Sequence, residues 1–286
     1  MDVTKAIEQQ GELNPLQMTG PTELTAKEKA KPYAKYFYMQ PATADPQHMA
    51  LMERPCDPGK AIGPERVSDL LNPGYLETEI GWCNLPNGTG FIANRTRLPG
   101  VTKEMIEWWF VFHALEDLRY KIWYPPQHYG VAVSPETREK ILNPEIPITK
   151  KFRGVTHHVL EDIGCGTEEL DINFLEPEQV GFDMARFHAP HVSTFVGGYA
   201  NIGAVNPATA IMVHFYREIP GGLEQRTRFW MGYRVHNSKP ELTLPPGAKV
   251  PEAAIHGLAI HNVLEYTNLA VFLPQIYGEM KGVIAE

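Results

Sequence analysis

The chain has 286 residues, of which 43% are hydrophobic, so it is long enough for one large domain or for one domain with a smaller appendage. Its formal net charge of −8 and its pI near 5.8 argue against nucleic acid as a partner, since no basic run offsets the acidic balance. No apolar run reaches the roughly 18 residues that suggest a membrane span. Cys56, Cys83 and Cys165 form no CxxC pair, and no apolar signal segment is evident, so a reducing, cytoplasmic setting is predicted.

Residues 1–75 differ from the rest of the chain because prolines interrupt them repeatedly. Such spacing permits only short helices, which are predicted at Ala26–Tyr36 and Pro64–Leu71. We therefore expect residues 1–75 to form an irregular arm or small subdomain, which packs on the main body or on a second subunit. Residues 76–286 would form the main domain.

From residue 76 onward the pattern becomes that of alternating strands and turns. Two β-like runs, Leu76–Cys83 and Gly90–Arg97, are joined by a turn sequence at Leu85–Gly88. A helix is predicted at Val101–His113, where Thr102 supplies the N-cap. Further extended segments are predicted at Arg119–Tyr124, Phe152–Ile163, Leu170–Phe174, Phe182–Phe187, His191–Tyr199, Ala208–Ile219 and Gln225–Val235.

The clearest helix is predicted at Pro251–Leu273. Pro251 suits the first turn of a helix, and apolar residues recur behind it at helical spacing. Many antiparallel strands followed by one long terminal helix favour an α+β fold. In such a fold the sheet would curve around the helix and leave a cavity between them.

Two copies of a His-x-x-x-Glu pattern suggest chemistry, one at His157–Glu161 (HHVLE) and one at His261–Glu265 (HNVLE). On a helix, residues four apart have Cβ atoms roughly 5–6 Å apart and can share one metal ion. On a strand the same spacing covers about 13 Å, which is too long for two bonds of about 2 Å to one ion. The second copy lies in the predicted helix, so His261 and Glu265 are candidate ligands of one metal. The plain alternative is a hydrogen bond between them.

The first copy lies in a predicted strand, so only Glu161 can join the helical pair. The best candidate for another histidine is His128, because the two prolines before it can fix its direction. Two histidines and two carboxylates suit Zn²⁺, which could polarise a carbonyl or lower the pKa of a bound water. Two histidines and one carboxylate would instead suit non-haem Fe(II) and oxygen chemistry. The residue pattern leaves both metals open.

Several segments, taken in order, resemble the 2,4-diacetylphloroglucinol hydrolase and phloretin hydrolase family. These segments are KIWYPPQH (Lys121–His128), HHVLEDIG (His157–Gly164), MVHFYRE (Met212–Glu218), RTRFWMG (Arg226–Gly232) and AIHNVLE (Ala259–Glu265). The resemblance implies a Bet v 1-like, helix-grip fold and a zinc enzyme. It also implies hydrolysis of the carbon–carbon bond between a phenolic, phloroglucinol-type ring and an acyl group, giving a phenol and a carboxylic acid.

The same resemblance implies roles for particular residues. The zinc ligands would be His128, Glu161, His261 and Glu265. His214 resembles the family's histidine near the metal, a general base or acid, and Tyr120 resembles a tyrosine that holds a substrate oxygen. Phe229 stands where a second tyrosine is expected, so substrate scope or orientation should differ.

The resemblance also bears on the cavity wall and on assembly. Trp108, Trp109, Trp123 and Trp230 are candidates for an aromatic wall around the substrate, although core packing is the expected role of at least two of them. The N-terminal arm is expected to support a homodimer. Two rival functions stay open: a non-catalytic helix-grip protein that binds a hydrophobic ligand, and an Fe(II) oxygenase. Absence of bound metal in the purified protein would favour the ligand-binding protein. Turnover that depends on oxygen would favour the Fe(II) oxygenase.

Overall fold

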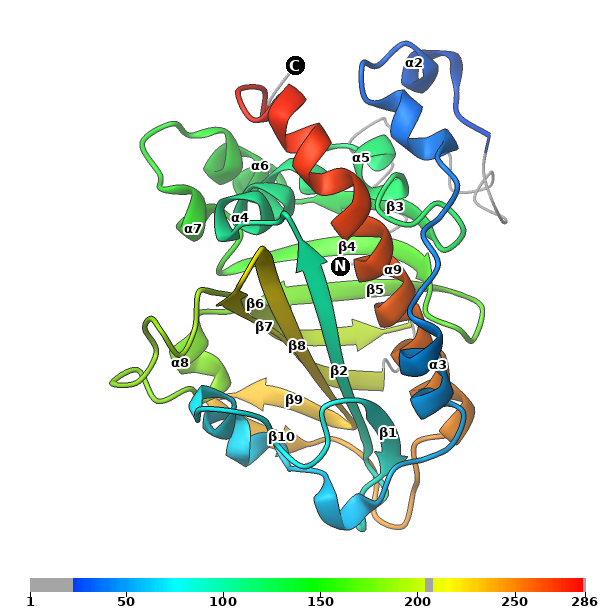
Figure 1. The fold of residues 1–286 in the computed structure, drawn as a ribbon, viewed down its shortest axis with the longest axis vertical. Coiled ribbons are helices and arrows are strands. Elements are labelled where there is room, and N and C mark those ends of the chain that lie inside the picture. Colours follow the sequence, from blue (N-terminus) through cyan, green and yellow to red (C-terminus); the bar gives the residue numbers. More distant parts are fainter. Residues whose placement is uncertain (1–22, 204–207, 285–286) are drawn as a thin grey trace.

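The computed structural model describes residues 23–203 and 208–284. Its centre is an antiparallel sheet of eight strands in the order β1-β2-β8-β7-β6-β5-β4-β3, and helix α9 crosses one face of that sheet (Figure 1). The strands are β1 (Gly81–Asn84), β2 (Gly90–Pro99), β3 (His128–Val133), β4 (Val155–Asp162), β5 (Thr167–Phe174), β6 (Thr194–Ile202), β7 (Ala208–Ile219) and β8 (Gly222–Met231). A separate hairpin joins β9 (Tyr233–His236) to β10 (Lys239–Leu242).

The described helices are mostly short, apart from α4 and α9. The α-helices are α2 (Ala26–Lys29), α3 (Pro46–Met52), α4 (Lys103–Phe112), α5 (Asp117–Lys121), α6 (Pro135–Leu142), α7 (Ile148–Lys151), α8 (Pro177–Val180) and α9 (Glu252–Met280). The 3₁₀ helices are Ala34–Tyr38, Pro58–Lys60, Pro64–Leu71 and His113–Leu115. None of the helices in the described ranges is long and apolar enough to cross a membrane.

The structure confirms the mixed organisation of helices and strands and the long C-terminal helix. Helix α9 continues beyond the predicted end at Leu273, even though Pro274 lies inside it. Proline removes one backbone donor and usually ends or kinks a helix. Here Ile276 and Met280 are buried beyond it, so tertiary packing favours the last turns.

Two predicted strands are wrong. Arg119–Tyr124 begins inside helix α5 and continues into a turn. Every residue of α5 is buried, so its sequence carries no alternation that separates helix from strand. Phe182–Phe187 forms turns and not a strand. Its two phenylalanines pack on each other with ring centroids 5.1 Å apart, so the apolar character reflects core packing.

Other boundaries move by a few residues. Strand β7 has the predicted bounds, whereas Leu76–Cys83 becomes strand only from Gly81. The predicted Gln225–Val235 divides into β8 and β9 at Gly232, whose φ of +90° favours glycine. Strand β3 was not predicted.

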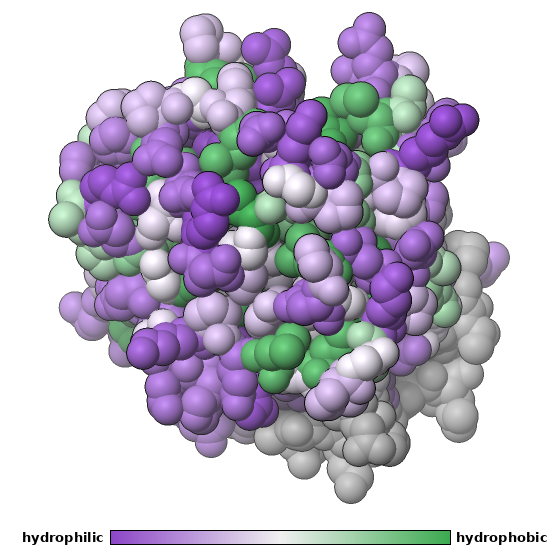
Figure 2. All heavy atoms as spheres, turned by 90° about the horizontal axis from the view of Figure 1, so that it is seen from below, coloured by the Kyte–Doolittle hydropathy of each residue, from purple (hydrophilic) through white to green (hydrophobic). Residues whose placement is uncertain are grey.

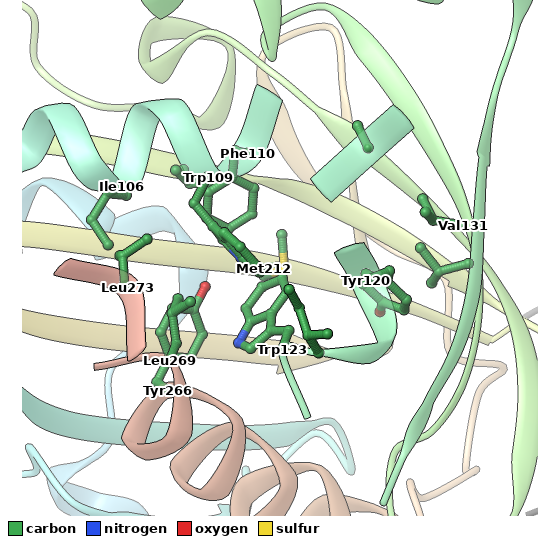
Figure 3. Packing of buried hydrophobic residues seen from close by; sticks show 14 of the residues in the cluster. Ile106, Trp109, Phe110, Tyr120, Trp123, Val131, Met212, Tyr266, Leu269 and Leu273 are labelled. Atoms are coloured by element: carbon green, nitrogen blue, oxygen red, sulfur yellow. The ribbon is translucent and has the colours of Figure 1, made fainter. Parts of the chain in front are cut away.

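A large apolar cluster lies between the sheet and helices α4 and α9. Trp109 and Phe110 of α4 gather there with Trp123, at ring-centroid distances of 6.1 and 5.6 Å (Figure 3). Leu269 and Leu273 of α9 belong to the same cluster. A second cluster lies on the opposite face of the sheet, because residues that alternate along a strand point to opposite sides.

The described part of the N-terminal segment packs on both faces of the sheet. Its predicted helix Ala26–Tyr36 is divided into α2 and the 3₁₀ helix Ala34–Tyr38, on either side of Pro32. Tyr33 and Met52 are buried in the first cluster, and Val67 and Leu70 in the second. Residues 1–22 of the predicted arm lie outside the described residues.

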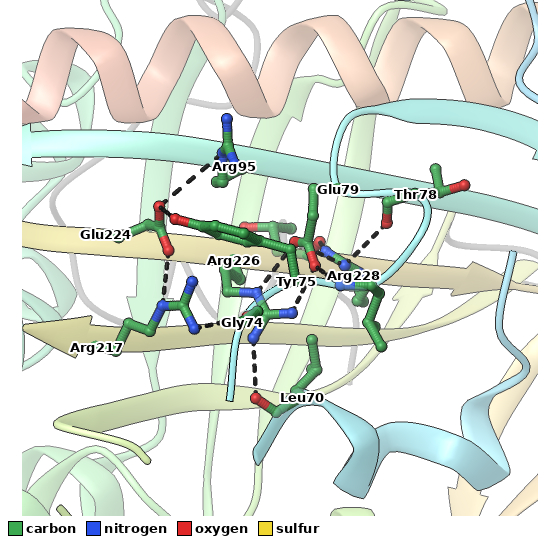
Figure 4. Close-up of polar contacts among 12 residues, drawn as sticks. Leu70, Gly74, Tyr75, Thr78, Glu79, Arg95, Arg217, Glu224, Arg226 and Arg228 are labelled. Carbon is green, nitrogen blue, oxygen red and sulfur yellow. Dashed lines mark hydrogen bonds and ion pairs between the residues drawn. The ribbon is translucent and has the colours of Figure 1, made fainter. Parts of the chain in front are cut away.

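A network of charges, buried around Glu79, Arg226 and Arg228, ties residues 74–79 to strands β7 and β8 (Figure 4). Glu79 accepts hydrogen bonds from Arg226 and Arg228, with N–O distances of 2.5–3.0 Å. The Tyr75 ring lies 4.5 Å from the guanidinium of Arg217. Figure 2 shows that hydrophilic side chains predominate on one face of the molecule, with hydrophobic ones in small groups between them.

Candidate functional site

The site begins with the pairing of strands β3 and β4. His128, the first residue of β3, lies directly opposite Glu161 on β4. Directly opposed residues of antiparallel strands project from the same face of the sheet. Nε2 of His128 is consequently 3.3 Å from Oε2 of Glu161.

Helix α9 brings two more groups to the same place. His261 and Glu265 are one turn apart, and both are buried. His261 Nε2 lies 3.8 Å from Oε2 of Glu161 and 4.0 Å from Oε2 of Glu265. His128 Nε2 lies 3.7 Å from Oε2 of Glu265. Ligand atoms of His128, Glu161 and His261 all fall within 4.8 Å of one another, a grouping that is able to hold a metal ion.

Neighbouring groups fix the direction of both imidazoles. His128 Nδ1 lies 3.3 Å from the carbonyl oxygen of Tyr120, and His261 Nδ1 lies 3.0 Å from Oε1 of Gln127. Since a carbonyl oxygen only accepts, each Nδ1 carries the hydrogen and each Nε2 keeps its lone pair. Lone pairs of both rings therefore face the two carboxylates, as metal-binding imidazoles require.

The electrostatics of this cluster suit a cation. Burial raises the pKa of Glu161 to about 7, and burial together with the charge of Glu161 raises the pKa of Glu265. Burial also lowers the pKa of His261 to about 4 and that of His128 well below its usual range. His128 Nε2 is buried without a hydrogen-bond partner among the described residues. A buried set of neutral nitrogens and carboxylate oxygens fits Zn²⁺ or a related divalent ion.

A cavity between the sheet and α9 adjoins the cluster. Glu161, His261 and Glu265 line it, together with Tyr120. The Tyr120 hydroxyl donates a hydrogen bond to Glu161. Most of the remaining lining is apolar or aromatic, as is typical of sites for small aromatic molecules.

His214 on β7 lines the same cavity. Its Nδ1 lies 2.9 Å from the hydroxyl oxygen of Thr227, its partner across the β7–β8 pair. Burial lowers the pKa of His214 to about 3, so the ring is neutral at neutral pH. The amide Nε2 of Gln225 also lies 3.4 Å from Nδ1. Because a hydroxyl can donate or accept, the contact with Thr227 orients the ring but does not decide which ring nitrogen carries the hydrogen.

Strand alternation separates two residues that were expected together at the substrate. Phe229 lines the cavity, but its neighbour Trp230 belongs to the apolar cluster on the opposite face of β8. Trp230 Nε1 donates a hydrogen bond of 2.7 Å to the carbonyl of Ile62. Adjacent residues of a regular strand point to opposite faces, so the placement of Trp230 at the substrate is corrected.

The other tryptophans also divide between core and cavity. Trp123 lines the cavity, and its Nε1 donates to the backbone oxygen of Glu265 at 3.2 Å. Trp108 stacks on Phe112 with ring centroids 4.3 Å apart, and Trp109 packs in the same core.

Two further histidines line the cavity, although neither was among the predicted site residues. These are His113 and His157, whose ring centroids are 5.3 Å apart. The alternation of β4 places His157 and Glu161 on the inner face, whereas His158 faces outward and meets Asp171 at 2.6 Å. The alternation of β4 could therefore have predicted that His157 faces the cavity. His113 is the last residue of the predicted helix Val101–His113, and its position there did not indicate which way it faces.

Fold and site together define an enzyme with a buried, metal-capable centre beside an aromatic cavity. The family model described as the DAPG hydrolase PhiG domain matches residues 62–278. A phloretin hydrolase from Eubacterium ramulus is 34% identical over 259 residues, which cover 89% of this chain and 92% of that protein. The chain therefore belongs to the DAPG hydrolase family, as its motifs predicted, and it is a hydrolase.

Two 2,4-diacetylphloroglucinol hydrolases are more distant relatives. One from a Pseudomonas species and one from Pseudomonas protegens are each 26% identical over 267 residues, or 87% of this chain. These matches cover 88% and 84% of the two relatives.

Proposed function

We propose that the protein hydrolyses the carbon–carbon bond between a phloroglucinol-type ring and an acyl group, releasing a phenol and a carboxylic acid. One observation carries the proposal: four metal-capable side chains converge beside an aromatic cavity. Membership of a family whose relatives are named for phloretin and 2,4-diacetylphloroglucinol supports the substrate class, because both names denote phenolic ketones.

The metal centre is part of this proposal. We assign His128, Glu161, His261 and Glu265 as the ligands and Zn²⁺ as the metal. The facing lone pairs of the two imidazoles and the unpartnered Nε2 of His128 support the assignment. When bound, such an ion would polarise a carbonyl oxygen or lower the pKa of a water molecule.

The chemistry requires a proton at the ring carbon. Breaking an aryl–acyl bond directly would leave an aryl carbanion, whereas the keto tautomer of the polyphenol leaves as a stabilised enolate. Water adds to the acyl carbonyl, the ring–acyl bond breaks, and the ring carbon keeps a hydrogen. The neutral imidazole of His214 would accept a proton from the attacking water and return it to the departing phenol, as general base and acid. The hydroxyl of Thr227 holds the ring of His214 in that orientation.

Tyr120 is assigned to a phenolic oxygen of the substrate. Burial and the neighbouring charge of Glu161 raise the pKa of Tyr120, so its hydroxyl stays protonated. Its hydrogen is donated to Glu161, and its oxygen can accept a hydrogen bond from a phenolic O–H of the substrate. Phe229 offers no second hydroxyl, which supports a substrate scope different from that of the diacetylphloroglucinol enzymes. The apolar lining excludes bulk water and strengthens each polar contact.

Three further assignments belong to this proposal. The sheet and α9 support a Bet v 1-like, helix-grip class for residues 76–286. We assign residues 1–75 to an N-terminal subdomain that takes part in a homodimer. The unpaired thiols of Cys56, Cys83 and Cys165 support a reducing, cytoplasmic location.

The test is to incubate the zinc-loaded protein with acylphloroglucinols and dihydrochalcones in ¹⁸O-labelled water. One phenol and one carboxylic acid carrying a single new ¹⁸O atom should appear per substrate consumed. Tight binding without products would favour the non-catalytic rival. The Fe(II)-loaded protein, incubated in parallel with and without dissolved oxygen, tests the other rival, and products that depend on oxygen there would favour the Fe(II) oxygenase.

A further inference from the structure

A chain of buried hydrogen bonds joins the N-terminal segment to the candidate metal centre. His48 of α3 places Nε2 3.3 Å from Oδ1 of Asn94 on β2. Asn94 Nδ2 donates to Oδ1 of Asn262 on α9 at 2.9 Å. Asn262 Nδ2 donates to Oε1 of Glu265 at 3.1 Å. Helix α3 lies beside α9 in the fold (Figure 1).

Donors and acceptors in this chain match in one direction only. Asn94 Oδ1 accepts from His48, and the second hydrogen of its amide goes to the carbonyl of Ala259 at 3.0 Å. Reversing the Asn94 amide would place its NH₂ group against the ring nitrogen that now donates, and its oxygen against the acceptors. Asn94 and Asn262 are fully buried, so no solvent competes for these bonds.

This series of hydrogen bonds ends at Oε1 of Glu265, the carboxylate oxygen that faces away from the two histidines. Because Asn262 holds Oε1, the other oxygen, Oε2, is directed toward His128 and His261 at 3.7 and 4.0 Å. A glutamate without such a partner has several side-chain torsions free. Partners behind a metal ligand fix its orientation, and their loss typically weakens metal binding 10–100-fold.

We propose that Asn262, Asn94 and His48 are positioning residues for Glu265, so that metal affinity depends on helix α3 of the N-terminal segment. This inference rests on the metal centre of the proposed function. His48 precedes the residues 62–278 that match the family model, so the support reaches the site from outside that region.

A merely structural role for these side chains would look different. They would then hold α9 against β2, and their loss would lower the stability of the fold without a specific effect on metal binding. Asn268 is a matched control on the same helix. It is buried, accepts from the backbone N–H of Ala42 at 3.0 Å and donates to the carbonyl of Trp123 at 2.7 Å. It therefore also ties the N-terminal segment to α9, but neither of these two bonds involves Glu265.

The experiment measures the zinc dissociation constant of the full-length protein by competition with a chromogenic chelator. Unfolding is followed in parallel, and the visible spectrum of the Co²⁺ form reports ligand geometry. Asn262→Ala should bind zinc about 10–100-fold more weakly and change the Co²⁺ spectrum. His48→Ala should weaken binding less, in the same direction. His48→Gln should restore affinity, because its amide N–H can donate to Asn94. Asn268→Ala should bind zinc as the wild type does.

Two results would overturn the inference alone. One is a folded Asn262→Ala protein with wild-type zinc affinity and an unchanged Co²⁺ spectrum. The other is an equal loss of affinity in Asn268→Ala. If Asn262→Ala does not fold, the two variants at His48 decide the matter. Equal zinc affinity in His48→Ala and His48→Gln would contradict the proposed hydrogen-bond series. Failure of the wild type to bind zinc would instead overturn the metal centre itself, and the inference with it.

Discussion

His128 and Glu161 are directly opposed residues of strands β3 and β4, and the atoms they present, Nε2 and Oε2, are 3.3 Å apart. Their proximity is a property of strand register. A slip by one residue would turn every side chain of one strand to the other face and separate the pair. Helix α9 then needs only to lay His261 and Glu265 over this pair to complete the cluster.

The proposed metal ligands are tested by removing one donor at a time. Glu265→Gln and His261→Ala should each lose most of the bound zinc, because a divalent ion in a buried site needs its full donor set. Zinc per chain is measured by mass spectrometry after dialysis, and a chelator should abolish turnover until zinc is restored. His158→Ala, on the outer face of β4, is the control with normal zinc. Unchanged zinc in both ligand variants would sink the assignment.

His214→Ala should separate chemistry from metal binding. Zinc content should stay at the wild-type level, while kcat falls by about 10²–10⁴-fold, the usual contribution of a general acid or base. Steady-state kinetics with an acylphloroglucinol and metal analysis of the same sample check both parts. A kcat within a few-fold of the wild type would remove His214 from the mechanism.

Phe229→Tyr adds a hydroxyl to the cavity wall. Without substrate, a buried hydroxyl that finds no partner should cost about 1–3 kcal/mol of stability. With substrate, it should favour acylphloroglucinols that carry an additional oxygen acceptor, so the ratio of kcat/KM between diacyl and monoacyl substrates should rise. Phe229→Leu is the comparison that changes the ring without adding an oxygen. Identical selectivity in the wild type and Phe229→Tyr would show that position 229 does not contact the reacting substrate.

The close approach of the β4–β5 turn to α9 should matter for the site. Gly164 has φ +98°, and a Cβ there would lie 2.4 Å from Cα of Gly257 on α9. Gly166 has a similar φ of +104°, and a Cβ added there would meet no atom within 4 Å. Both Gly→Ala variants should lose about 1–2 kcal/mol from backbone strain. Only Gly164→Ala should lose more stability than this and also bind zinc more weakly. Urea unfolding measures the stability, and chelator competition measures the zinc binding. Equal effects in the two variants would contradict the steric account.

Acid stability should depend on Glu79. Burial opposes its ionisation, but Arg228 and Arg226 outweigh burial and lower the pKa of Glu79 to about 2. A folded-state pKa below the ordinary value of 4.5 stabilises the fold above pH 4.5, and that stability is lost as the pH falls toward 2. The shift corresponds to about 3 kcal/mol.

Glu79→Gln tests this dependence. The variant should be less stable at pH 7, by about 3–5 kcal/mol, because two buried guanidinium groups lose their partner. Between pH 5 and 2 its stability should fall less steeply than that of the wild type, as urea unfolding at several pH values measures. Glu241→Gln, from the exposed pair with Arg234, should follow the wild-type curve. Parallel curves for Glu79→Gln and the wild type would contradict the prediction.

Much of this site could be predicted from local spacing. His261 and Glu265 are four positions apart, which places both on one face of any helix, and the same spacing on β4 allowed only Glu161. The predicted place of Trp230 beside the substrate is wrong because strand alternation turns it to the face opposite Phe229, its neighbour in the sequence. Arg119–Tyr124 was misassigned because a segment buried on all sides carries no period.

The sequence by itself determined the long helix and most of the antiparallel strands, because these follow from periodicity. It also contained the histidines and glutamates that were predicted as candidate metal ligands. Only the tertiary structure decided that His128 opposes Glu161, and that His48 reaches Glu265 through Asn94 and Asn262. Both relationships join residues far apart along the chain. Register and buried hydrogen bonds arise from packing the sheet, α9 and the N-terminal segment together, and no local pattern encodes that packing.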